Sequence, residues 1–426
     1  MPHEGDYDES GAGVTGITKA MKQERTALNG DEAVAYAAKQ SDVDVVAAYP
    51  ITPQTIIVEK FSEYVANGEV QTEFVCTESE HSALAACLAA SATGARTFTA
   101  SASAGLALMH EMLFVTSGCR APVVMAIANR ALSAPLNIHG DKSDSMAERD
   151  SGWVQIYVEN AQEAYDSIIQ AFRIAEDVDV SLPVIVGLDG FTLSHTLENV
   201  TVLSNDDALK FVGTRPFPNV LTHEGKNAPF KLDPENPMTM GPIALTNYYF
   251  EFKRQQEEAM KNALEMIQKV NAEYSELTGR SYGDGLVEPY RLEDAEVAVV
   301  CVGSTSGTLK TIVDALRQDG VKAGLLRLRT FRPLPVEALR SALQNVKALA
   351  VMDKSMSFGG NGGAVYHEVR HVLYDAEAHP IVVNYIYGLG GRDSSPHDLR
   401  RVYEDLLRIL KSGRVEKQIT YLGLRE

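Results

Sequence analysis

Glu80 is the residue of this sequence whose type and setting most clearly suggest chemistry. It lies three positions after Thr77 and precedes the alanine-rich run Ser82–Ala86. The pattern Thr77-x-x-Glu80 matches a capping box, in which Glu80 would only close the start of a helix. A carboxyl group against an apolar wall can instead stay protonated, or share a proton with a ring nitrogen of a bound cofactor. The spacing alone leaves both interpretations open.

The segment that follows indicates how this carboxyl group is positioned. Residues 77–111 read as a helix, a strand, and a loop rich in Ser, Ala and Gly that opens a second helix. The loop is Ser101–Gly105. Side chains this small allow another backbone, or a flat ligand, to approach closely.

These elements belong to a predicted α/β domain over residues 28–204. Apolar strands at 43–48, 72–76, 97–100, 122–127 and 183–188 alternate with helices such as 30–40, 55–67, 104–116 and 161–176. This alternation predicts a parallel sheet covered on both faces, whose ligands bind beyond the carboxyl ends of the strands. Four loops are expected to meet there: Tyr49–Pro53, Thr77–Glu80, Ser101–Gly105 and Ala128–Arg130.

The rest of the chain divides into three parts. Residues 1–27 are predicted to be a flexible tail. Residues 205–290 are broken by prolines and contain a long polar helix at about 243–277, typical of a connector or of an arm packed on another chain. Residues 291–426 form a second predicted α/β domain with a C-terminal tail, with strands at 297–302, 322–328, 348–352 and 381–386 and helices at 307–318, 336–345, 364–373 and 396–411.

Two glycine-rich loops of the second domain, Ser357–Gly363 and Gly388–Asp393, precede helices. Such loops can cradle phosphate, but they also serve as tight turns. We favour the structural interpretation.

Composition excludes several classes of function. The chain has 426 residues, 45% hydrophobic and 23% charged, as in ordinary globular proteins. A net charge of −18 argues against nucleic acid or an anionic membrane as a main partner. No signal or transit peptide and no membrane-spanning apolar run is evident, so we expect a cytoplasmic location.

The four cysteines, Cys76, Cys87, Cys119 and Cys301, form no C-x-x-C pair. Iron–sulfur clusters normally require clustered cysteines, so this chain is expected to bind none by itself.

Eight ordered blocks resemble the α chain of the multi-subunit pyruvate:ferredoxin oxidoreductases, over nearly all of the chain from Leu28 to Gly423. They are Tyr49–Pro53, Glu78–His81, Thr97–Glu111, Ala128–Ala134, Met146–Trp153, Asp189–His195, Arg329–Pro333 and Gly388–Asp393. The resemblance implies a thiamine diphosphate enzyme that cleaves a 2-oxo acid oxidatively, passes acetyl to coenzyme A and reduces ferredoxin. It also implies that this chain grips the aminopyrimidine of the cofactor. A β chain would hold the diphosphate and magnesium, and the 4Fe-4S clusters would lie on partner subunits, among β, γ and δ.

The resemblance also assigns roles to three residues. Glu80 matches the glutamate that hydrogen-bonds the pyrimidine ring, which favours the imino form that activates the thiazolium carbon. Thr52 matches a threonine that contacts the substrate oxygen, although it also suits a turn between two prolines. Arg130 matches the arginine that binds the substrate carboxylate, although a surface salt bridge is its simpler explanation.

The sequence departs from related patterns in two places. Gly283-Asp284-Gly285 looks like the magnesium–diphosphate motif of thiamine enzymes, but no Asn follows it before Gln344, so we interpret it as a simple turn. Relatives usually have a His in the acidic loop after the arginine, where this chain has Asp141-Lys142-Ser143-Asp144. Lys142 cannot replace an imidazole as a proton acceptor, so that loop receives no role.

Three functions remain open from the sequence. The first is a catalytic subunit acting on pyruvate, in either direction. The second is the same chemistry on a branched 2-oxo acid, and the third is an architectural subunit that has lost the site. Thr52 argues against the oxalate-using branch, which places a cation there.

Overall fold

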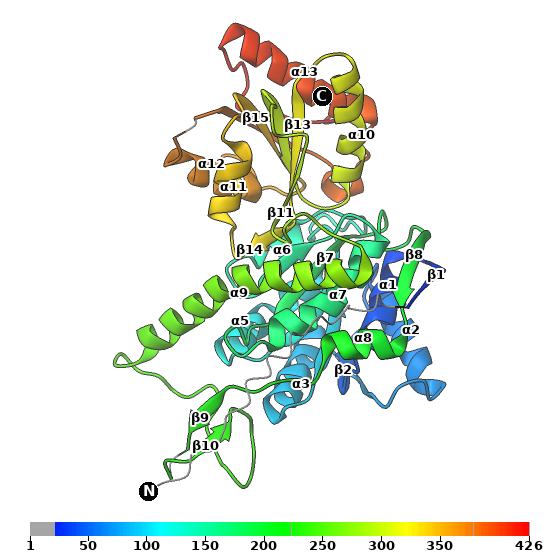
Figure 1. Ribbon diagram of the computed structural model, residues 1–426, viewed down its shortest axis with the longest axis vertical. Coiled ribbons are helices and arrows are strands. Elements are labelled where there is room, and N and C mark those ends of the chain that lie inside the picture. The colour runs from blue at the N-terminus through cyan, green and yellow to red at the C-terminus, as the bar shows by residue number, and fades with distance from the viewer. Residues whose placement is uncertain (1–21, 223, 378, 426) are drawn as a thin grey trace, which may run out of the picture.

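The computed structural model describes residues 22–222, 224–377 and 379–425. These residues form two α/β bodies placed end to end, with the long helix α9 (Tyr249–Thr278) along the side of the first body (Figure 1). The predicted fold class, two parallel-sheet domains joined by a loop and helix connector, is confirmed. None of the described helices is long and apolar enough to cross a membrane.

The first sheet has seven strands in the order β14-β6-β7-β5-β4-β2-β3, and only the β14–β6 pair is antiparallel. Its strands are β2 (Val45–Ala48), β3 (Glu73–Cys76), β4 (Thr97–Ser101), β5 (Val123–Asn129), β6 (Val154–Tyr157), β7 (Val184–Asp189) and β14 (Thr330–Arg332). Strands β4, β5 and β7 are buried along their whole length, which explains their continuous apolar sequences.

Helices cover both faces of this sheet. They are α1 (Gly30–Gln40), α2 (Thr55–Ala66), α3 (Glu80–Thr93), α4 (Ser103–Leu108), α5 (His110–Gly118), α6 (Ser143–Ala147), α7 (Ala161–Glu176) and α8 (Asn205–Val212). Val124 and Ala126 of β5 share a core with α1 and α7, whereas Val123 and Met125 share one with α3 to α5. The two-residue period of the strand therefore separates the two helical layers.

The predicted tail over residues 1–27 is corrected at its end. Residues 1–21 lie outside the described residues. Gln23–Leu28 form strand β1, which pairs antiparallel with β8 (Glu198–Leu203). Both strands are short and half polar, so neither has a local sequence pattern that predicts a strand. They form because the fold brings them side by side.

The predicted boundary of the second domain, at residue 291, is corrected by two strands. β11 (Val287–Tyr290) precedes that boundary but joins the second sheet, pairing antiparallel with β13 (Ala323–Leu328). β14 follows it by some forty residues in the chain, yet closes the edge of the first sheet against β6. Strand β14 therefore brings the chain of the second domain back to the edge of the first sheet.

The second sheet has the order β11-β13-β12-β15-β16-β17. Its remaining elements are β12 (Val297–Cys301), β15 (Ala348–Asp353), β16 (Ile381–Ile386), β17 (Ile419–Tyr421), α10 (Thr305–Gln318), α11 (Val336–Leu343), α12 (Ala364–Tyr374), a short 3₁₀ turn (Leu389–Gly391) and α13 (Pro396–Ser412). All pairs except β11–β13 are parallel.

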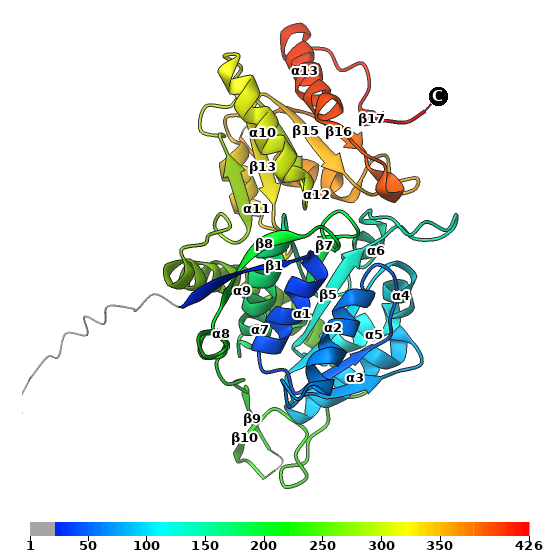
Figure 2. The same cartoon turned by 90° about the vertical axis from the view of Figure 1, so that its right-hand side faces the viewer.

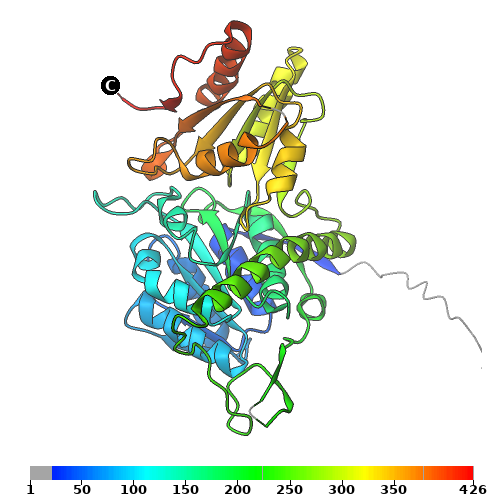
Figure 3. The same ribbon diagram turned by 90° about the vertical axis from the view of Figure 1, so that its left-hand side faces the viewer.

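The connector contains a small hairpin, β9 (Asn219–Leu221) with β10 (Asn227–Pro229), followed by α9. Helix α9 begins at Tyr249 rather than at the predicted Ile243 and crosses one side of the first domain (Figure 3). After α9, the Asp284 carboxylate accepts the backbone N–H groups of Leu286 and Val287 at 2.9 and 2.8 Å. The Gly283–Gly285 segment is thus a side-chain-stabilised turn.

Buried ion pairs join the two domains. The Glu163 carboxylate on α7 accepts from Arg327 Nη1 at 2.7 Å and from Arg329 Nε at 2.8 Å, and all three side chains are fully buried. Separating these side chains would leave a buried charge without a partner, so the contact between the two domains resists opening.

Candidate active site

The carboxyl ends of the parallel strands of the first sheet face the second domain (Figure 2). The loops after β2, β3, β4 and β5 therefore lie along one edge, as the sequence predicted. The position of each candidate residue on this edge follows from the cap or turn that holds it.

Glu80 is the first residue of α3, and the N-cap lies two positions later than the capping box at Thr77 would place it. Ser79 is the N-cap, and its hydroxyl accepts the N–H of Ser82 at 3.3 Å. Thr77 instead donates its hydroxyl to the carbonyl of Ala48. The Glu80 side chain is consequently free of capping. It is buried, with 6% of the residue exposed, and no hydrogen bond joins its carboxylate to another described residue.

A cradle of small residues faces the Glu80 carboxylate. A Cβ atom on Gly105 would lie 2.5 Å from Glu80 Oε1 and 2.7 Å from Ser101 Oγ. The Ser101 hydroxyl is buried and has no hydrogen-bond partner among the described residues. A carboxyl group and a hydroxyl group, both lacking partners beside a residue that has no side chain, fit the polar edge of a flat ring.

Arg130 and Thr52 are brought together at the same edge. The guanidinium of Arg130 donates through Nη1 to the carbonyl of Thr52 at 2.9 Å and through Nε to the carbonyl of Asn137 at 3.1 Å. Arg130 is buried, with 7% exposed, and Thr52 is exposed. Arg130 is therefore not part of a surface salt bridge. The other three of its five N–H groups have no partner among the described residues.

Asp144 is a site residue that the sequence did not reveal. Its Oδ2 atom accepts the backbone N–H groups of Ser103 and Arg130, each at 2.9 Å. Its Oδ1 atom accepts the side-chain amide of Asn129 at 2.8 Å. Burial raises the pKa of Asp144 to about 6, although these hydrogen bonds oppose the shift. One carboxylate thus fixes the ends of β4 and β5 to each other.

Lys142, in the same loop, is also fully buried. Its Nζ atom lies 2.7 Å from Asp189 Oδ1 at the end of β7. Asp189 also contacts Lys354 at 3.3 Å and accepts the N–H and O–H of Ser304 from the second domain. Burial would raise the pKa of Asp189, but the two ammonium groups hold it well below its usual range. Asp189 thus joins Lys142 of the first domain to Lys354 and Ser304 of the second.

The first glycine-rich loop is structural, as we favoured. The amides of Val365 and Tyr366 at the start of α12 donate to the Asp353 carboxylate at 2.8 and 3.1 Å. A Cβ atom on Gly363 would lie 2.0 Å from the carboxyl carbon of that aspartate. The protein's own carboxylate therefore occupies the position that a phosphate would take.

The second glycine-rich loop docks onto the loop that follows Arg130. Gly390 donates its N–H to Asp141 at 2.9 Å, and Asn137 donates to the carbonyl of Gly390 at 3.0 Å. A cavity of about 710 Å³ lies beside this contact, between residues 131–149 and the loop Ser355–Phe358. The backbone that positions Arg130 thus forms one wall of an interdomain cavity.

Comparison with known proteins identifies the family of this chain. Residues 36–272 match the family model of the thiamine diphosphate-binding part of pyruvate flavodoxin/ferredoxin oxidoreductases, and residues 295–399 match core domain II of the pyruvate:ferredoxin oxidoreductases. Pyruvate synthase subunit PorA of Methanocaldococcus jannaschii is 52% identical over 88% of this chain and 93% of its own length. Ketoisovalerate oxidoreductase subunit VorA of Pyrococcus horikoshii is 42% identical over 93% of this chain and 98% of its own.

A solved structure supports the fold. The 2-oxoglutarate:ferredoxin oxidoreductase of Magnetococcus marinus superposes with a TM-score of 0.68 at 19% identity. The match covers 90% of this chain and 65% of that one. Since one family model spans more than half of the sequence, and the resemblance seen in its motifs is confirmed, the chain belongs to the pyruvate:ferredoxin oxidoreductase family of 2-oxo acid oxidoreductases.

Proposed function

We propose that this chain is the pyrimidine-binding subunit of an enzyme that converts pyruvate, coenzyme A and two oxidised ferredoxins to acetyl-CoA, CO₂, a proton and two reduced ferredoxins, or runs the reverse synthesis. The similarity to a pyruvate synthase subunit over 88% of the chain supports this substrate. In the proposal a β chain holds the diphosphate and magnesium of the cofactor. The 4Fe-4S clusters that pass electrons to ferredoxin lie on partner subunits, among β, γ and δ.

The observation that carries the proposal is the uncapped Glu80 carboxyl group beside Ser101 and Gly105. When bound, thiamine diphosphate supplies a carbon nucleophile for 2-oxo acids, and its aminopyrimidine ring is flat with both donor and acceptor nitrogens. The cradle suits such a ring because the Glu80 carboxylate and the Ser101 hydroxyl pack side by side against the bare backbone of Gly105, and neither has a hydrogen-bond partner among the described residues. Glu80 would form a hydrogen bond to this ring through its carboxyl group.

Arg130 and Thr52 bind the substrate in this proposal. The bond from Arg130 Nη1 to the Thr52 carbonyl fixes the guanidinium plane, and the N–H groups of Nη2 are left for a carboxylate. The exposed hydroxyl of Thr52 then lies on the same loop as the carbonyl that holds Arg130. A 2-oxo acid has its carboxylate and carbonyl oxygen on adjacent carbons, so a neighbouring cation and hydroxyl match its two acceptors.

Branched 2-oxo acids are the second candidate, because a ketoisovalerate oxidoreductase subunit is 42% identical over 93% of this chain. The experiment is to purify the intact complex through a tag on this chain and to measure ferredoxin reduction with pyruvate, 2-oxoisovalerate and 2-oxoglutarate. We expect the highest kcat/KM with pyruvate. A higher kcat/KM with 2-oxoisovalerate would show that a branched 2-oxo acid is the substrate. If the complex turns over none of the three acids, the chain is an architectural subunit that has lost the site.

A further inference from the structure

Phe191 holds a backbone conformation that is rare for a large side chain. Its φ angle is 60°, in the left-handed region that glycine and asparagine favour. Its N–H donates to the Ser194 hydroxyl at 2.9 Å, and its carbonyl accepts the N–H of His195 at 3.3 Å. Such a conformation persists only where the surrounding structure enforces it, and it commonly accompanies a functional constraint. The contacts of the phenyl ring indicate what that constraint is.

The Phe191 ring contacts two histidine rings. Its centroid lies 5.3 Å from that of His139 and 4.8 Å from that of His195. Both distances are within the range at which aromatic rings attract each other. His139 belongs to the loop that follows Arg130, whereas Phe191 follows the end of β7. The ring therefore links the end of β7 to the loop that follows Arg130.

This loop, residues 131–139, supplies one of the two carbonyls that orient Arg130. The Ala131 N–H donates to the His139 carbonyl at 3.1 Å and closes the loop at its base. The Asn137 side chain accepts the N–H of His139 at 2.8 Å. The Asn137 carbonyl accepts from Arg130 Nε at 3.1 Å. A shift of His139 would therefore move the carbonyl that holds the guanidinium.

The other carbonyl, that of Thr52, is supported by the residue next to Phe191. A Cβ atom on Gly190 would lie 2.9 Å from Cγ of Pro53, which directly follows Thr52. The Gly190 N–H donates to the Asn129 carbonyl, one residue before the arginine, at 3.0 Å. Only a residue without a side chain fits so close to both. Gly190 thus packs against the turn that carries Thr52.

We propose that Gly190 and Phe191 are positioning residues for Arg130. These two consecutive residues support both carbonyls to which the guanidinium donates. Gly190 supports the Thr52 carbonyl through Pro53, and Phe191 supports the other through His139. The inference rests on the proposed function, in which the guanidinium binds the carboxylate of a 2-oxo acid. A side chain whose acceptors are fixed loses less freedom on binding than one carried by a mobile loop.

The test is steady-state kinetics of the intact complex with pyruvate. Phe191→Asn removes the ring but keeps a residue that tolerates a positive φ, so the chain should still fold. It should raise KM by about 2- to 10-fold, the cost of ordering one long side chain on binding. The value of kcat should not change, because binding weakens equally in the ground state and the transition state. Phe191→Tyr keeps the ring and should keep the wild-type KM.

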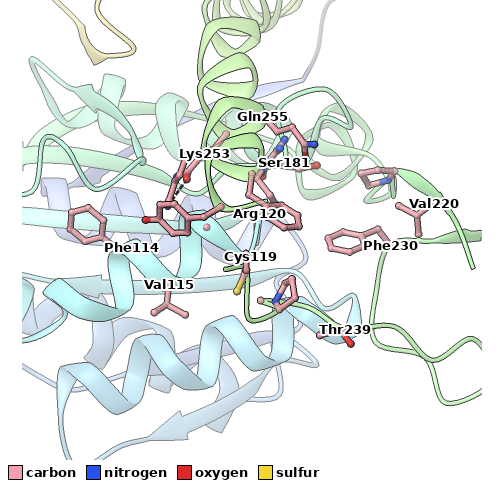
Figure 4. Close-up of a pocket in the computed structure, with 18 of the residues that line it drawn as sticks. Phe114, Val115, Cys119, Arg120, Ser181, Val220, Phe230, Thr239, Lys253 and Gln255 are labelled. Atoms are coloured by element: carbon pink, nitrogen blue, oxygen red, sulfur yellow. Dashed lines mark hydrogen bonds between the residues drawn. The ribbon is translucent and has the colours of Figure 1, made fainter. Parts of the chain in front are cut away.

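His139→Ala is a second variant, which removes the other ring of the same contact. His139 is exposed, so this chain should fold, and its KM should rise in the same way. The matched control is Phe230→Asn, which should leave KM unchanged. Phe230 is partly buried like Phe191, but it lines a cavity of about 770 Å³ beside the β9–β10 hairpin (Figure 4). That hairpin lies at the end of the first domain that is far from the second (Figure 1).

Combining Phe191→Asn with Arg130→Ala separates positioning from a general loss of structure. If Phe191 acts through the guanidinium, its substitution should cause no further loss of kcat/KM once the guanidinium is absent. Losses that multiply in the double variant overturn the positioning role. So do an unchanged KM in both Phe191→Asn and His139→Ala, and an equal rise in the control.

The single variant Arg130→Ala distinguishes this inference from the proposed function. If it loses kcat/KM while Phe191→Asn behaves as wild type, only the positioning role fails. If Arg130→Ala itself behaves as wild type, the proposed role of Arg130 fails, and the positioning role fails with it.

Discussion

Arg130 Nη1 lies 2.9 Å from the carbonyl oxygen of Thr52 and joins the loops that follow β5 and β2. These two strands are separated in the sheet by β4, so the bond spans the carboxyl end of the strand that leads to Ser101 and Gly105. If Arg130 binds the substrate carboxylate as we propose, the guanidinium is oriented before the substrate arrives, which would lower the cost of binding.

Arg130→Ala should reduce kcat/KM for pyruvate by about 30- to 5000-fold, because truncating one partner of a buried charge pair costs roughly 2–5 kcal/mol. Arg130→Lys should restore part of the loss, since an ammonium lacks the planar fork. Thiamine diphosphate content, measured on the same preparation, should not change. Unchanged efficiency with the cofactor retained would place the substrate pocket elsewhere.

Glu80→Gln should slow turnover by about 10²–10⁴-fold while the complex still assembles, because an amide cannot exchange the proton that the carboxyl group holds. Glu78→Gln is the matched control. Glu78 lies two residues earlier, is exposed, and bonds only Ser82 among the described residues. Wild-type turnover in an assembled Glu80→Gln complex would show that the carboxyl group has no catalytic role.

Gly105→Ala should disturb the Glu80 carboxylate directly. The added methyl group would lie 2.5 Å from Glu80 Oε1, closer than a carbon and an oxygen can approach. A displacement of about 1 Å in a catalytic group can cost 10²-fold in rate, so turnover and cofactor retention should both fall. Gly118→Ala on α5 is the control, because its methyl group would meet only Lys253 Nζ at 3.8 Å. Equal turnover and cofactor retention in the two variants would contradict the proposed packing of Glu80 against Gly105.

Asp144 should give the enzyme a pH dependence near 6. Above its pKa of about 6 the carboxylate accepts the N–H groups of both Ser103 and Arg130. Protonation removes an acceptor, so KM for the 2-oxo acid should rise as the pH falls through 6. Asp144→Asn should mimic this loss at neutral pH, with kcat/KM lower by roughly 5- to 150-fold.

The stability of the fold should respond to Asp144 in the opposite direction. Its folded-state pKa lies above the ordinary value of 3.8, so the folded chain binds the proton first as the pH falls from about 6. Protonation of this group therefore adds stability between those two pH values. A rise in KM near pH 6 should appear without thermal destabilisation attributable to Asp144. Unfolding that coincides with the KM change would assign the effect to another group.

The isolated chain should contain no iron–sulfur cluster and should be inactive. Cys87 and Cys301 are buried, and burial raises the pKa of each thiol to about 12, far from the thiolate that ligates iron. Cys76 is exposed and Cys119 partly so. The chain is to be expressed anaerobically without partners, and its iron content and visible spectrum measured. Stoichiometric iron in the isolated chain would contradict the proposal that the clusters lie on partner subunits.

Periodicity predicted the elements well where the pattern is local. Helices 30–40 and 161–176 were predicted at their observed bounds, because each begins with an Asn cap and has a clear apolar stripe. Strand β14 was missed because three residues, Thr330–Arg332, have no pattern of their own and gain a strand only from β6. β1 was missed for the same reason.

The candidate site was predicted less completely than the fold. Thr77 and Ser79 are both plausible caps, and only the backbone conformation selects Ser79. The contact between Arg130 and Thr52 joins residues 78 positions apart through a main-chain carbonyl, which no side-chain pattern encodes. Asp144 was overlooked because its partners are two backbone amides supplied by different loops.

The position of β14 determines where the polypeptide can be divided. A fragment that ends near residue 290 keeps every other strand of the first sheet but leaves the outer edge of β6 without a partner strand. It also leaves the buried Glu163 carboxylate without Arg327 and Arg329. Bare strand edges recruit other chains, and an unpaired buried charge weakens what remains, so such a fragment should aggregate. A soluble fragment of the first domain must therefore include Thr330–Arg332. The same holds for a chimaera in which the first domain is exchanged with that of a relative. Recombination between relatives is thus confined to junctions beyond this strand.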